Sequence, residues 1–244
     1  MSVAPCLLEA RALRVRFGER SVLEDCALAL PAGEAVVLTG DNGSGKTTLL
    51  RVLAGLDAPQ GGEVLFSGTR VDRGLAGEAR RRLQYVSSHP YLFSTSVRGN
   101  LGYGLAMAGI PAAERERRVA EAVAWARLAD VLSTAPGQLS SGERQRVAIA
   151  RARVLDPAVV LLDEPTANLD SRSRAEVLAL VRSLCAGGAA VLVAAHDRDW
   201  DTLPDARRVR LQDGRVVETG PAEAASGIGP SAGEQPAGAA GRAG

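Results

Sequence analysis

Apolar residues recur along the chain at spacings that predict strands near both ends. EARALRVRF and VLEDCALAL, on either side of the turn-like GER, have the alternation of two short strands. A steeply apolar strand, AVVLTG, ends at Gly40, and a helix is predicted from Thr47 through LLRVLAGL. Near the other end, VRLQDGRVVE alternates apolar and polar residues around Asp213-Gly214, which is typical of a two-residue hairpin.

The middle of the chain predicts helices, followed by two strands that are buried on both faces. Residues 111–132 carry apolar residues at helical spacing, and a second helix, SGERQRVAIARARVL, follows the loop STAPGQLS. The continuous apolar runs VVLLDEP and VLVAAHD predict buried strands, with the helix SRSRAEVLALVRSL between them. This order is that of a β-α-β unit in a parallel sheet, and the helical segment before it is an insertion.

Size and composition are those of a globular protein. The chain has 244 residues, of which 46% are hydrophobic, enough for a substantial core. We expect one domain over residues 1–220, with a helical subdomain at about 88–155, and a disordered tail over 221–244, where Gly, Ala and Pro dominate. No segment approaches the ~20 apolar residues that cross a bilayer, so any membrane role is expected to need another polypeptide.

Charge and cysteine content argue against two broad classes. The net charge is +1, with arginines and carboxylates interspersed, so nucleic acid is not expected as a partner. The cysteines, Cys6, Cys26 and Cys185, are odd in number and lack a C-x-x-C pair. That favours reduced thiols in a cytosolic protein over a disulfide framework or a zinc site.

The segment GDNGSGKT, residues 40–47, fits the pattern G-x-x-x-x-G-K-[ST] between a strand and a helix. Glycines let backbone N–H groups close around phosphate oxygens, and the helix N-terminus adds further donors. Lys46 can reach the β and γ phosphates of a nucleotide, and Thr47 can offer its hydroxyl to Mg²⁺. Lys46 is also the only lysine of the chain, and a slim ammonium suits a tightly wrapped loop better than a guanidinium. The alternative is a glycine-rich turn that only caps a helix.

Two acids follow the apolar run VVLL, at the edge where ligands bind in open parallel sheets. Asp163 is predicted to hold Mg²⁺, and Glu164 to orient or deprotonate the attacking water. Because adjacent residues on a strand point to opposite faces, the two acids should have different roles. The alternative is an acidic pair that merely caps the next helix.

The stretch LSSGERQR, residues 139–146, begins an amphipathic helix with Ser140 as N-cap and Glu143 three residues on, a capping box. Taken alone, it predicts a helix start whose N–H groups are open to an anion. With the phosphate loop and the acidic strand end, it resembles the ATP-binding cassette family, whose signature LSGGQ is matched by LSSGE. Ser141 and Glu143 are the substitutions, and the resemblance covers about residues 7–220.

The resemblance implies a fold, cofactors and site residues. The fold is α/β, with a phosphate-loop NTPase core, an antiparallel β subdomain and a helical subdomain. Two such domains sandwich two molecules of ATP with Mg²⁺, head to tail. The residues expected to bind ATP in the same chain are Phe17, Gly40, Asp41, Asn42, Gly43, Ser44, Gly45, Lys46, Thr47 and Thr48. The signature expected to face the γ-phosphate held by the second subunit is Ser140, Ser141, Gly142 and Glu143.

The family also implies roles for residues in the second half of the chain. Asp163 joins Thr47 as a metal ligand, Glu164 and His196 are catalytic, and Asp170 in TANLD communicates across the dimer. His196, after the strand VLVAA, matches the switch histidine that contacts γ-phosphate. Without the family, a histidine after a strand is more often a satisfied polar residue, and Phe17 would be a core aromatic. Met107 and Trp125 are expected to be packing residues.

One family element is missing. The segment YVSSHPYLFSTSVRGNL aligns with a loop that usually carries a glutamine touching Mg²⁺ and the attacking water, yet Ser88 stands in its place. The shorter hydroxyl could reach the metal only through a bridging water. Gln84, four residues earlier and expected inside a strand, is a poor substitute.

The resemblance implies an ATPase subunit that works as a homodimer at the cytoplasmic face of the cell membrane. Its partners would be transmembrane permease subunits and an extracytoplasmic substrate-binding protein. Stand-alone cassettes are typical of importers, and LFSTSVRGNLGYGL is similar to segments of importers for oxyanions such as tungstate or molybdate. One alternative is a soluble cassette ATPase acting on ribosomes or DNA, but those usually carry two cassettes or long coiled-coil insertions. The other, a regulatory module that binds ATP without hydrolysing it, fits poorly with the presence of Glu164 and His196.

Overall fold

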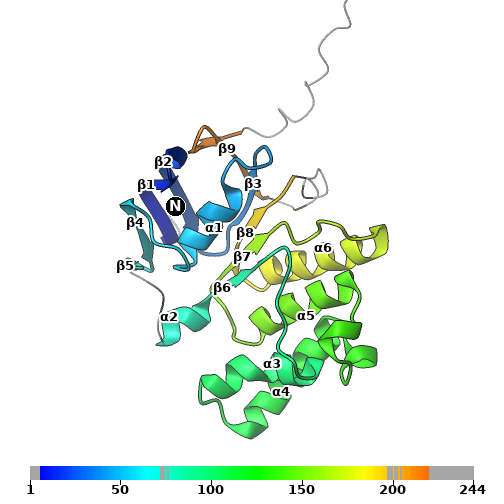
Figure 1. The fold of residues 1–244 in the computed structure, drawn as a ribbon. Coiled ribbons are helices and arrows are strands. Elements are labelled where there is room, and N and C mark those ends of the chain that lie inside the picture. Colours follow the sequence, from blue (N-terminus) through cyan, green and yellow to red (C-terminus); the bar gives the residue numbers. More distant parts are fainter. Residues whose placement is uncertain are drawn as a thin grey trace, which may run out of the picture.

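The computed structural model describes residues 6–71, 75, 77–196, 200, 203 and 205–219, so the predicted tail lies outside the described residues. These residues form two sheets with helices around them (Figure 1). The strands are β1 (Cys6–Phe17), β2 (Arg20–Pro31), β3 (Ala35–Thr39), β4 (Gly61–Phe66), β5 (Thr69–Arg70), β6 (Leu83–Val86), β7 (Val159–Asp163), β8 (Ala190–Ala194), β9 (Arg207–Gln212) and β10 (Arg215–Glu218). The α-helices are α1 (Lys46–Leu53), α2 (Gly77–Arg82), α3 (Val97–Met107), α4 (Ala112–Trp125), α5 (Ser141–Arg153) and α6 (Ser171–Ala186).

The central sheet has the strand order β10-β9-β3-β8-β7-β6. All of its neighbouring strands pair in parallel except β9 and β10, which pair antiparallel. β7 and β8 are buried at every position, as their continuous apolar runs predict. In the pairing register, Ala194 of β8 lies beside both Leu38 of β3 and Asp163 of β7. The segments that follow these three strands therefore meet at one edge of the sheet.

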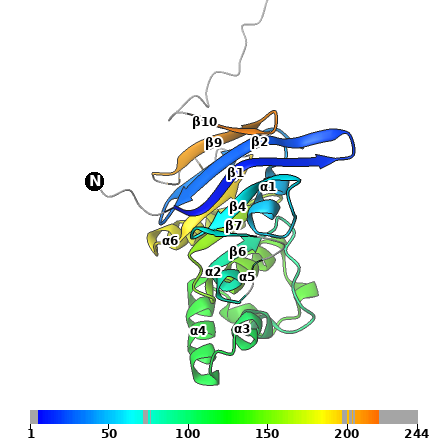
Figure 2. The same ribbon diagram turned by 90° about the vertical axis from the view of Figure 1, so that its left-hand side faces the viewer.

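The second sheet is antiparallel, with the order β2-β1-β4-β5, and lies over one face of the central sheet (Figure 2). Helix α1 packs between the two sheets, because one hydrophobic cluster joins Leu13 of β1, Leu49 of α1 and Val36 of β3. β1 and β2 confirm the two predicted N-terminal strands, whereas β4 and β5 have no counterpart among the predicted elements. The packing of α1 against both sheets fixes the start of that helix.

The helices between β6 and β7 cover the other side of the central sheet. Helix α5 packs against α3, α4 and α6 (Figure 1). A second hydrophobic cluster contains Leu101 of α3, Val119 of α4, Ile149 of α5 and Val160 of β7, while Leu161 of β7 belongs to the first cluster. The alternation along β7 shows that the two clusters lie on opposite faces of the sheet.

One predicted helix needs correction, one observed helix has no counterpart in the prediction, and the predicted hairpin is confirmed. The helix predicted over residues 111–132 is interrupted, because α4 ends at Trp125, Arg127 has a φ of 52°, and a 3₁₀ turn (Ala129–Val131) follows. Helix α3 was not predicted, since three glycines within its span lower the helical propensity. The hairpin at Asp213-Gly214 has φ values of 48° and 74°, the positive angles that a type I′ turn requires.

Candidate nucleotide-binding site

The phosphate loop leaves β3 and enters α1, and two of its glycines cannot be replaced without displacing neighbours. Gly40 and Gly45 have φ angles of 151° and 107°. A Cβ at Gly40 would stand 2.7 Å from the carbonyl oxygen of Leu211, and one at Gly45 would stand 2.7 Å from Cγ1 of Val22. The loop is thus wrapped tightly against β2 and β9.

The start of α1 presents unused donors to the loop. Gly45 is the N-cap and offers no side chain, so the N–H groups of the first helical turn have no side-chain cap. Ser44 Oγ is buried and has no hydrogen-bond partner among the described residues. Orphan donors at a helix N-terminus form a cradle that fits the phosphates of a nucleotide.

Lys46 lies at the centre of the site, with only 5% of its surface exposed. Its Nζ donates to the carbonyl oxygens of Gly40 (2.9 Å) and Asp41 (3.2 Å), and lies 3.8 Å from Glu164 Oε1. Burial lowers the pKa of Lys46, while the carboxylates of Glu164, Asp163 and Asp41 oppose that shift. The ammonium is therefore held on the loop, close to the acids that follow β7.

Glu164 and His196 both reach Lys46. Glu164 follows β7 with a φ of 45°, and its N–H donates to the carbonyl of Ala194 at 2.8 Å, which fixes the turn. Nε2 of His196 lies 2.7 Å from Glu164 Oε1 and 2.8 Å from Lys46 Nζ. One nitrogen cannot accept from an ammonium and donate to a carboxylate at once. The three groups compete, and an anion bound among them would give Lys46 another partner.

Asp163 and Thr47 form a hydrogen-bonded pair of oxygen groups beside the phosphate loop. Asp163 is 3% exposed, and its Oδ1 accepts a hydrogen bond of 3.2 Å from the Thr47 hydroxyl. Its Oδ2 accepts one of 3.1 Å from the Tyr85 hydroxyl. Burial, together with Asp163, raises the pKa of Tyr85, so the phenol stays protonated and is the donor.

The donor set fits Mg²⁺ better than a transition metal. No group of three or more His, Cys, Asp or Glu side chains that could hold a metal occurs in the part of the chain that the structure describes. Mg²⁺ is usually bound by one or two protein oxygens together with phosphate oxygens and water. A carboxylate and a hydroxyl at the edge of a phosphate cradle match that requirement.

Phe17 is 61% exposed, which removes the alternative of a core aromatic. It ends β1 and pairs with Arg20 at the start of β2. The Arg20 guanidinium donates to the carbonyl of Gly43 at 2.9 Å, so this end of the hairpin is tied to the phosphate loop. The residue predicted to stack on adenine therefore lies at the hairpin end that borders the loop.

The signature segment forms the helix start that its local pattern predicts. Ser140 Oγ accepts from the N–H of Glu143 at 3.3 Å, and Glu143 Oε2 accepts from the N–H of Ser140 at 2.8 Å, a complete capping box. Hydrogen bonds from Ser140 lower the pKa of Glu143. Ser140 and Ser141 are exposed, and no hydrogen bond between described residues joins them to the phosphate loop. The predicted contact of these residues with a nucleotide held by a second subunit stays a prediction.

Gly142 and Asp170, predicted separately, are linked through Ser173. A Cβ at Gly142 would stand 2.3 Å from Ser173 Oγ, so the absence of a side chain lets the start of α5 rest on the start of α6. Asp170 is the N-cap of α6 and accepts from both the N–H and the hydroxyl of Ser173, each at 2.9 Å. These bonds lower the pKa of Asp170. Sequence patterns gave no signal for this link.

We expect Gly142→Ala to lower thermal stability, by about 1–3 kcal/mol, the usual cost of overpacking. The added methyl would overlap Ser173, and either α5 or the cap of α6 must move. Gly137→Ala is the matched control, since a Cβ at Gly137 meets nothing within 4 Å. Thermal unfolding of the two variants checks this, and equal midpoints would mean that the two helix starts are not in firm contact.

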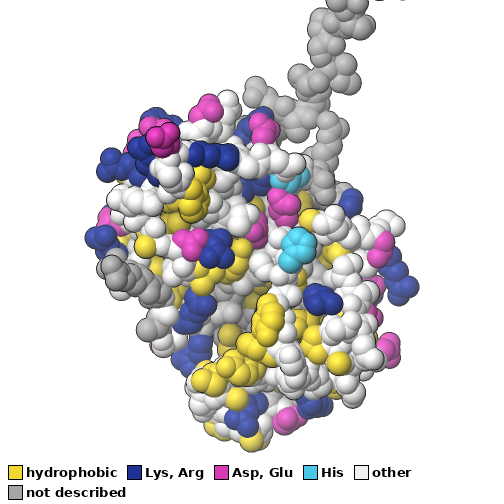
Figure 3. All heavy atoms as spheres, viewed as in Figure 1, with side chains coloured by type: hydrophobic (Ala, Val, Ile, Leu, Met, Phe, Trp, Pro, Cys, Tyr) yellow, Lys and Arg dark blue, Asp and Glu magenta, His cyan; other side chains and the backbone are white. Residues whose placement is uncertain are grey.

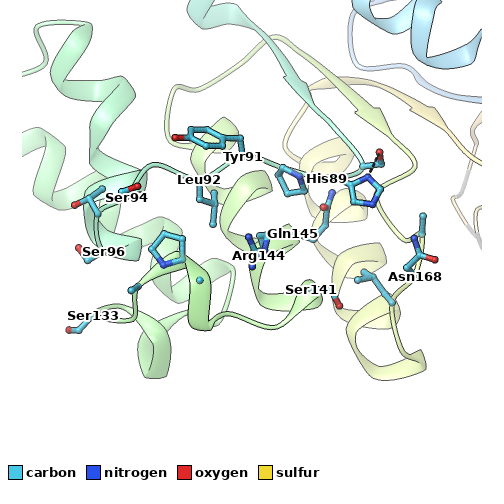
Figure 4. A pocket seen from close by; sticks show the side chains of 18 residues that line it. His89, Tyr91, Leu92, Ser94, Ser96, Ser133, Ser141, Arg144, Gln145 and Asn168 are labelled. Carbon is cyan, nitrogen blue, oxygen red and sulfur yellow. Dashed lines mark hydrogen bonds between the residues drawn. The ribbon is translucent and has the colours of Figure 1, made fainter.

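Ser88 lies in the wall of a cavity of about 980 Å³ beside the signature (Figure 4). Its hydroxyl is 3.2 Å from Nδ1 of His89, the neighbouring residue. His89, Ser141 and Asn168 lie toward one end of this cavity, and Ser133 lies at the other end. No hydrogen bond between described residues joins Ser88 to Asp163 or Thr47. Its predicted water-mediated contact with the metal stays a prediction.

An aromatic patch, consisting of Tyr91, Phe93 and Tyr103, lies on α3 and the loop before it. The Phe93 ring is 4.4 Å from that of Tyr103, and the Arg151 guanidinium lies over Phe93. Met107 is 72% exposed, so its prediction as a packing residue is wrong. Figure 3 shows hydrophobic side chains gathered over this helical region on the same face as both histidines. Exposed apolar patches of this kind mark interaction surfaces.

The fold and the cradle define a phosphate-loop nucleotide-binding protein, and comparison with known proteins gives its family. The family described as "ABC transporter" matches residues 23–167. The phosphate import ATP-binding protein PstB 2 of Natronomonas pharaonis is 40% identical over 219 residues, covering 85% of this chain and 77% of that protein. The chain belongs to the ABC transporter family of ATP-binding proteins.

Other relatives differ in length and direction of transport. The macrolide export ATP-binding/permease protein MacB of Nitrosomonas europaea is 40% identical over 87% of this chain, but the chain spans only 34% of it. The dimeric ATP-binding cassette MJ0796, solved in a post-hydrolysis state with ADP and Pi, superposes with a TM-score of 0.77 at 29% identity, covering 86% of this chain and 96% of that one. The predicted α/β fold is thereby confirmed. Among the described residues, no helix is both long and apolar enough to cross a membrane.

Proposed function

We propose that this chain hydrolyses ATP and thereby powers the import of a solute through separate membrane subunits. The observation that carries the proposal is the convergence of Lys46, Glu164 and His196 at the mouth of the phosphate loop. A regulatory module that only binds ATP would need the lysine and the glycines, but not a carboxylate and a histidine beside them.

Each of these side chains has a distinct task in hydrolysis. When ATP is bound, Lys46 pairs with the β and γ phosphates instead of with His196. Glu164, freed from the ammonium, accepts the proton of the attacking water, and His196 donates Nε2–H to the γ-phosphate. Mg²⁺, when bound by Thr47 and Asp163, supplies neutralising charge for the transferring phosphoryl group.

The second half of each site comes from another copy of the chain. Ser140 and Ser141 are exposed, and among the described residues neither has a hydrogen bond to its own phosphate loop. In a head-to-tail homodimer they face the γ-phosphate of the partner, and Asp170 signals across the contact through Ser173. The dimeric form reported for the cassette MJ0796 supports this arrangement.

The membrane partners dock on the aromatic patch at the cytoplasmic face of the membrane. The patch offers exposed aromatic area beside Arg151, and Tyr91 also lines the 980 Å³ cavity that contains Ser88. A permease on this surface therefore reaches the nucleotide site through the loop from Ser88 to Ser96. An extracytoplasmic substrate-binding protein would deliver the solute to the permease.

Import of an oxyanion is the finer proposal. PstB 2 is named for phosphate import, and a relative in Haloferax volcanii, 38% identical over 89% of this chain, is named a probable anion import ATP-binding protein. The similarity of LFSTSVRGNLGYGL to segments of oxyanion importers points to tungstate or molybdate as the cargo. MacB, named for export, favours the opposite direction as the second candidate.

Reconstitution with its membrane permease tests the proposal. ATP turnover should need Mg²⁺ and rise when molybdate or tungstate, with its binding protein, is offered on the side opposite the ATPase. Phosphate is the matched control solute. If none of these solutes changes the rate of ATP hydrolysis, the oxyanion proposal is wrong. If the chain hydrolyses no ATP at all, the proposed ATPase function is wrong.

We expect Ser88→Gln to lower the Mg²⁺ concentration needed for half-maximal ATPase rate, because the longer amide can reach the metal and water directly. The change should be modest, since a water bridge costs only ~0–2 kcal/mol of immobilisation. Ser87→Gln, one residue earlier in the same loop, is the control. If Ser88→Gln alters neither the isolated subunit nor the assembled transporter, Ser88 is not the equivalent of the family glutamine.

A further inference from the structure

The carboxylate of Asp163 is held by two different elements, one on each oxygen. The Thr47 hydroxyl of α1 donates to Oδ1 at 3.2 Å, and the Tyr85 hydroxyl of β6 donates to Oδ2 at 3.1 Å. Asp163 is almost completely buried, so it cannot turn freely to find water. With both oxygens engaged, the plane of the carboxylate is fixed.

Tyr85 is itself well placed to act as a fixed support. β6 pairs in parallel with β7, and Tyr85 lies opposite Leu161, two residues before Asp163. Its ring is partly buried and packs against the hydrophobic cluster that joins the two sheets. The rigid ring of Tyr85 therefore carries the phenol hydroxyl along the neighbouring strand to Asp163.

Other polar residues of β6 and the following loop are directed elsewhere. Gln84 Nε2 donates to the carbonyls of Arg80 and Arg81 at 2.8 and 3.0 Å, which ties it to α2. The Ser88 hydroxyl lies 3.2 Å from His89 Nδ1. Within the described residues, Tyr85 is the side chain from this strand and loop that has a hydrogen bond to Asp163.

A neutral donor suits this position. An arginine or lysine on Oδ2 would place a positive charge beside the cation site and repel the metal. The phenol satisfies Oδ2 without adding charge, and Oδ1 stays on the Thr47 side. Although this chain lacks the family glutamine, Tyr85 supports Asp163, its predicted metal ligand.

We propose that Tyr85 is a positioning residue for Mg²⁺, which orients Asp163 so that Oδ1 and the Thr47 hydroxyl face the cation together. This inference rests on the proposed function, because it assumes that Mg²⁺ and ATP bind at the phosphate loop. In this role Tyr85 acts through its hydrogen bond to Asp163.

Calorimetric titration of the full chain with ATP, once with Mg²⁺ and once with EDTA, tests the inference in Tyr85→Phe. The variant removes a single hydroxyl, so its metal-free affinity for ATP should equal that of the parent. The gain in affinity that Mg²⁺ brings should shrink about tenfold, the usual loss when the partner of a metal ligand is removed. Thr69→Val, which removes one exposed hydroxyl from β5, is the matched control.

The outcomes separate the inference from the function on which it rests. If Mg²⁺ raises the ATP affinity of the parent and of Tyr85→Phe by the same factor, the positioning role is overturned and the proposed ATPase function stands. A parent that binds no ATP overturns both. Equal losses with and without Mg²⁺ would show that Tyr85 only packs, which also overturns the inference. Should Tyr85→Phe fail to fold, Tyr85→Met, apolar and of similar length, is measured in the same way.

Discussion

Lys46→Ala is expected to abolish measurable binding of ATP. The ammonium is the only cationic group within the phosphate loop, and it is almost fully buried there, between the carbonyls of Gly40 and Asp41. A nucleotide that entered the loop without it would bring several negative charges against Glu164 and Asp163, and the buried ammonium that balances them would be missing. Calorimetry with Mg²⁺ and ATP measures the loss.

Lys46→Arg separates charge from shape in the same experiment. It keeps the positive charge, but a planar, forked guanidinium cannot reproduce the compact contacts of Nζ with two carbonyl oxygens at 2.9 and 3.2 Å. We therefore expect it to lose most of the affinity as well. Arg11→Ala, which removes an exposed charge from β1, is the control for net charge. ATP bound by Lys46→Ala as tightly as by the parent would show that residues 40–47 are not the phosphate site.

The elements that bear the site could be predicted because their signals are local. The apolar runs of β3, β7 and β8 have the lengths of buried strands, and the phosphate loop follows one of them directly. Helix α3 escaped prediction because Gly99, Gly102 and Gly104 mask its periodicity, and only its packing against α4 and α5 makes it helical. α4 ends next to Arg127, whose backbone has a positive φ angle, and no sequence pattern predicts that angle.

The contacts that tie the site together could not be predicted, because they join residues far apart in sequence. Tyr85 and Asp163 are 78 positions apart and meet only through the register of β6 and β7. The contact between Gly142 and Ser173 depends on how α5 crosses the start of α6. Motifs therefore identified the groups of the site, whereas the positions of their supports follow from strand pairing and helix packing.

Glu164→Gln is expected to bind ATP with Mg²⁺ and to hydrolyse it at least ~100-fold more slowly than the parent, a typical loss for a general base. The substitution keeps the size of the side chain and its contact with His196, but an amide cannot take a proton from water. Because product formation normally opens the ATP sandwich, the variant should accumulate as an ATP-bound dimer, which gel filtration detects.

Glu121→Gln, on the exposed side of α4, is the matched control for the loss of one carboxylate and should behave as the parent does. Steady-state turnover, nucleotide affinity and dimer content are measured on all three proteins. If Glu164→Gln kept near-parent turnover, the base would lie elsewhere, and His196, 2.7 Å from Glu164 and 2.8 Å from Lys46, would be the next residue to substitute. Slow turnover without a trapped dimer would instead keep Glu164 as the base and contradict the head-to-tail assembly.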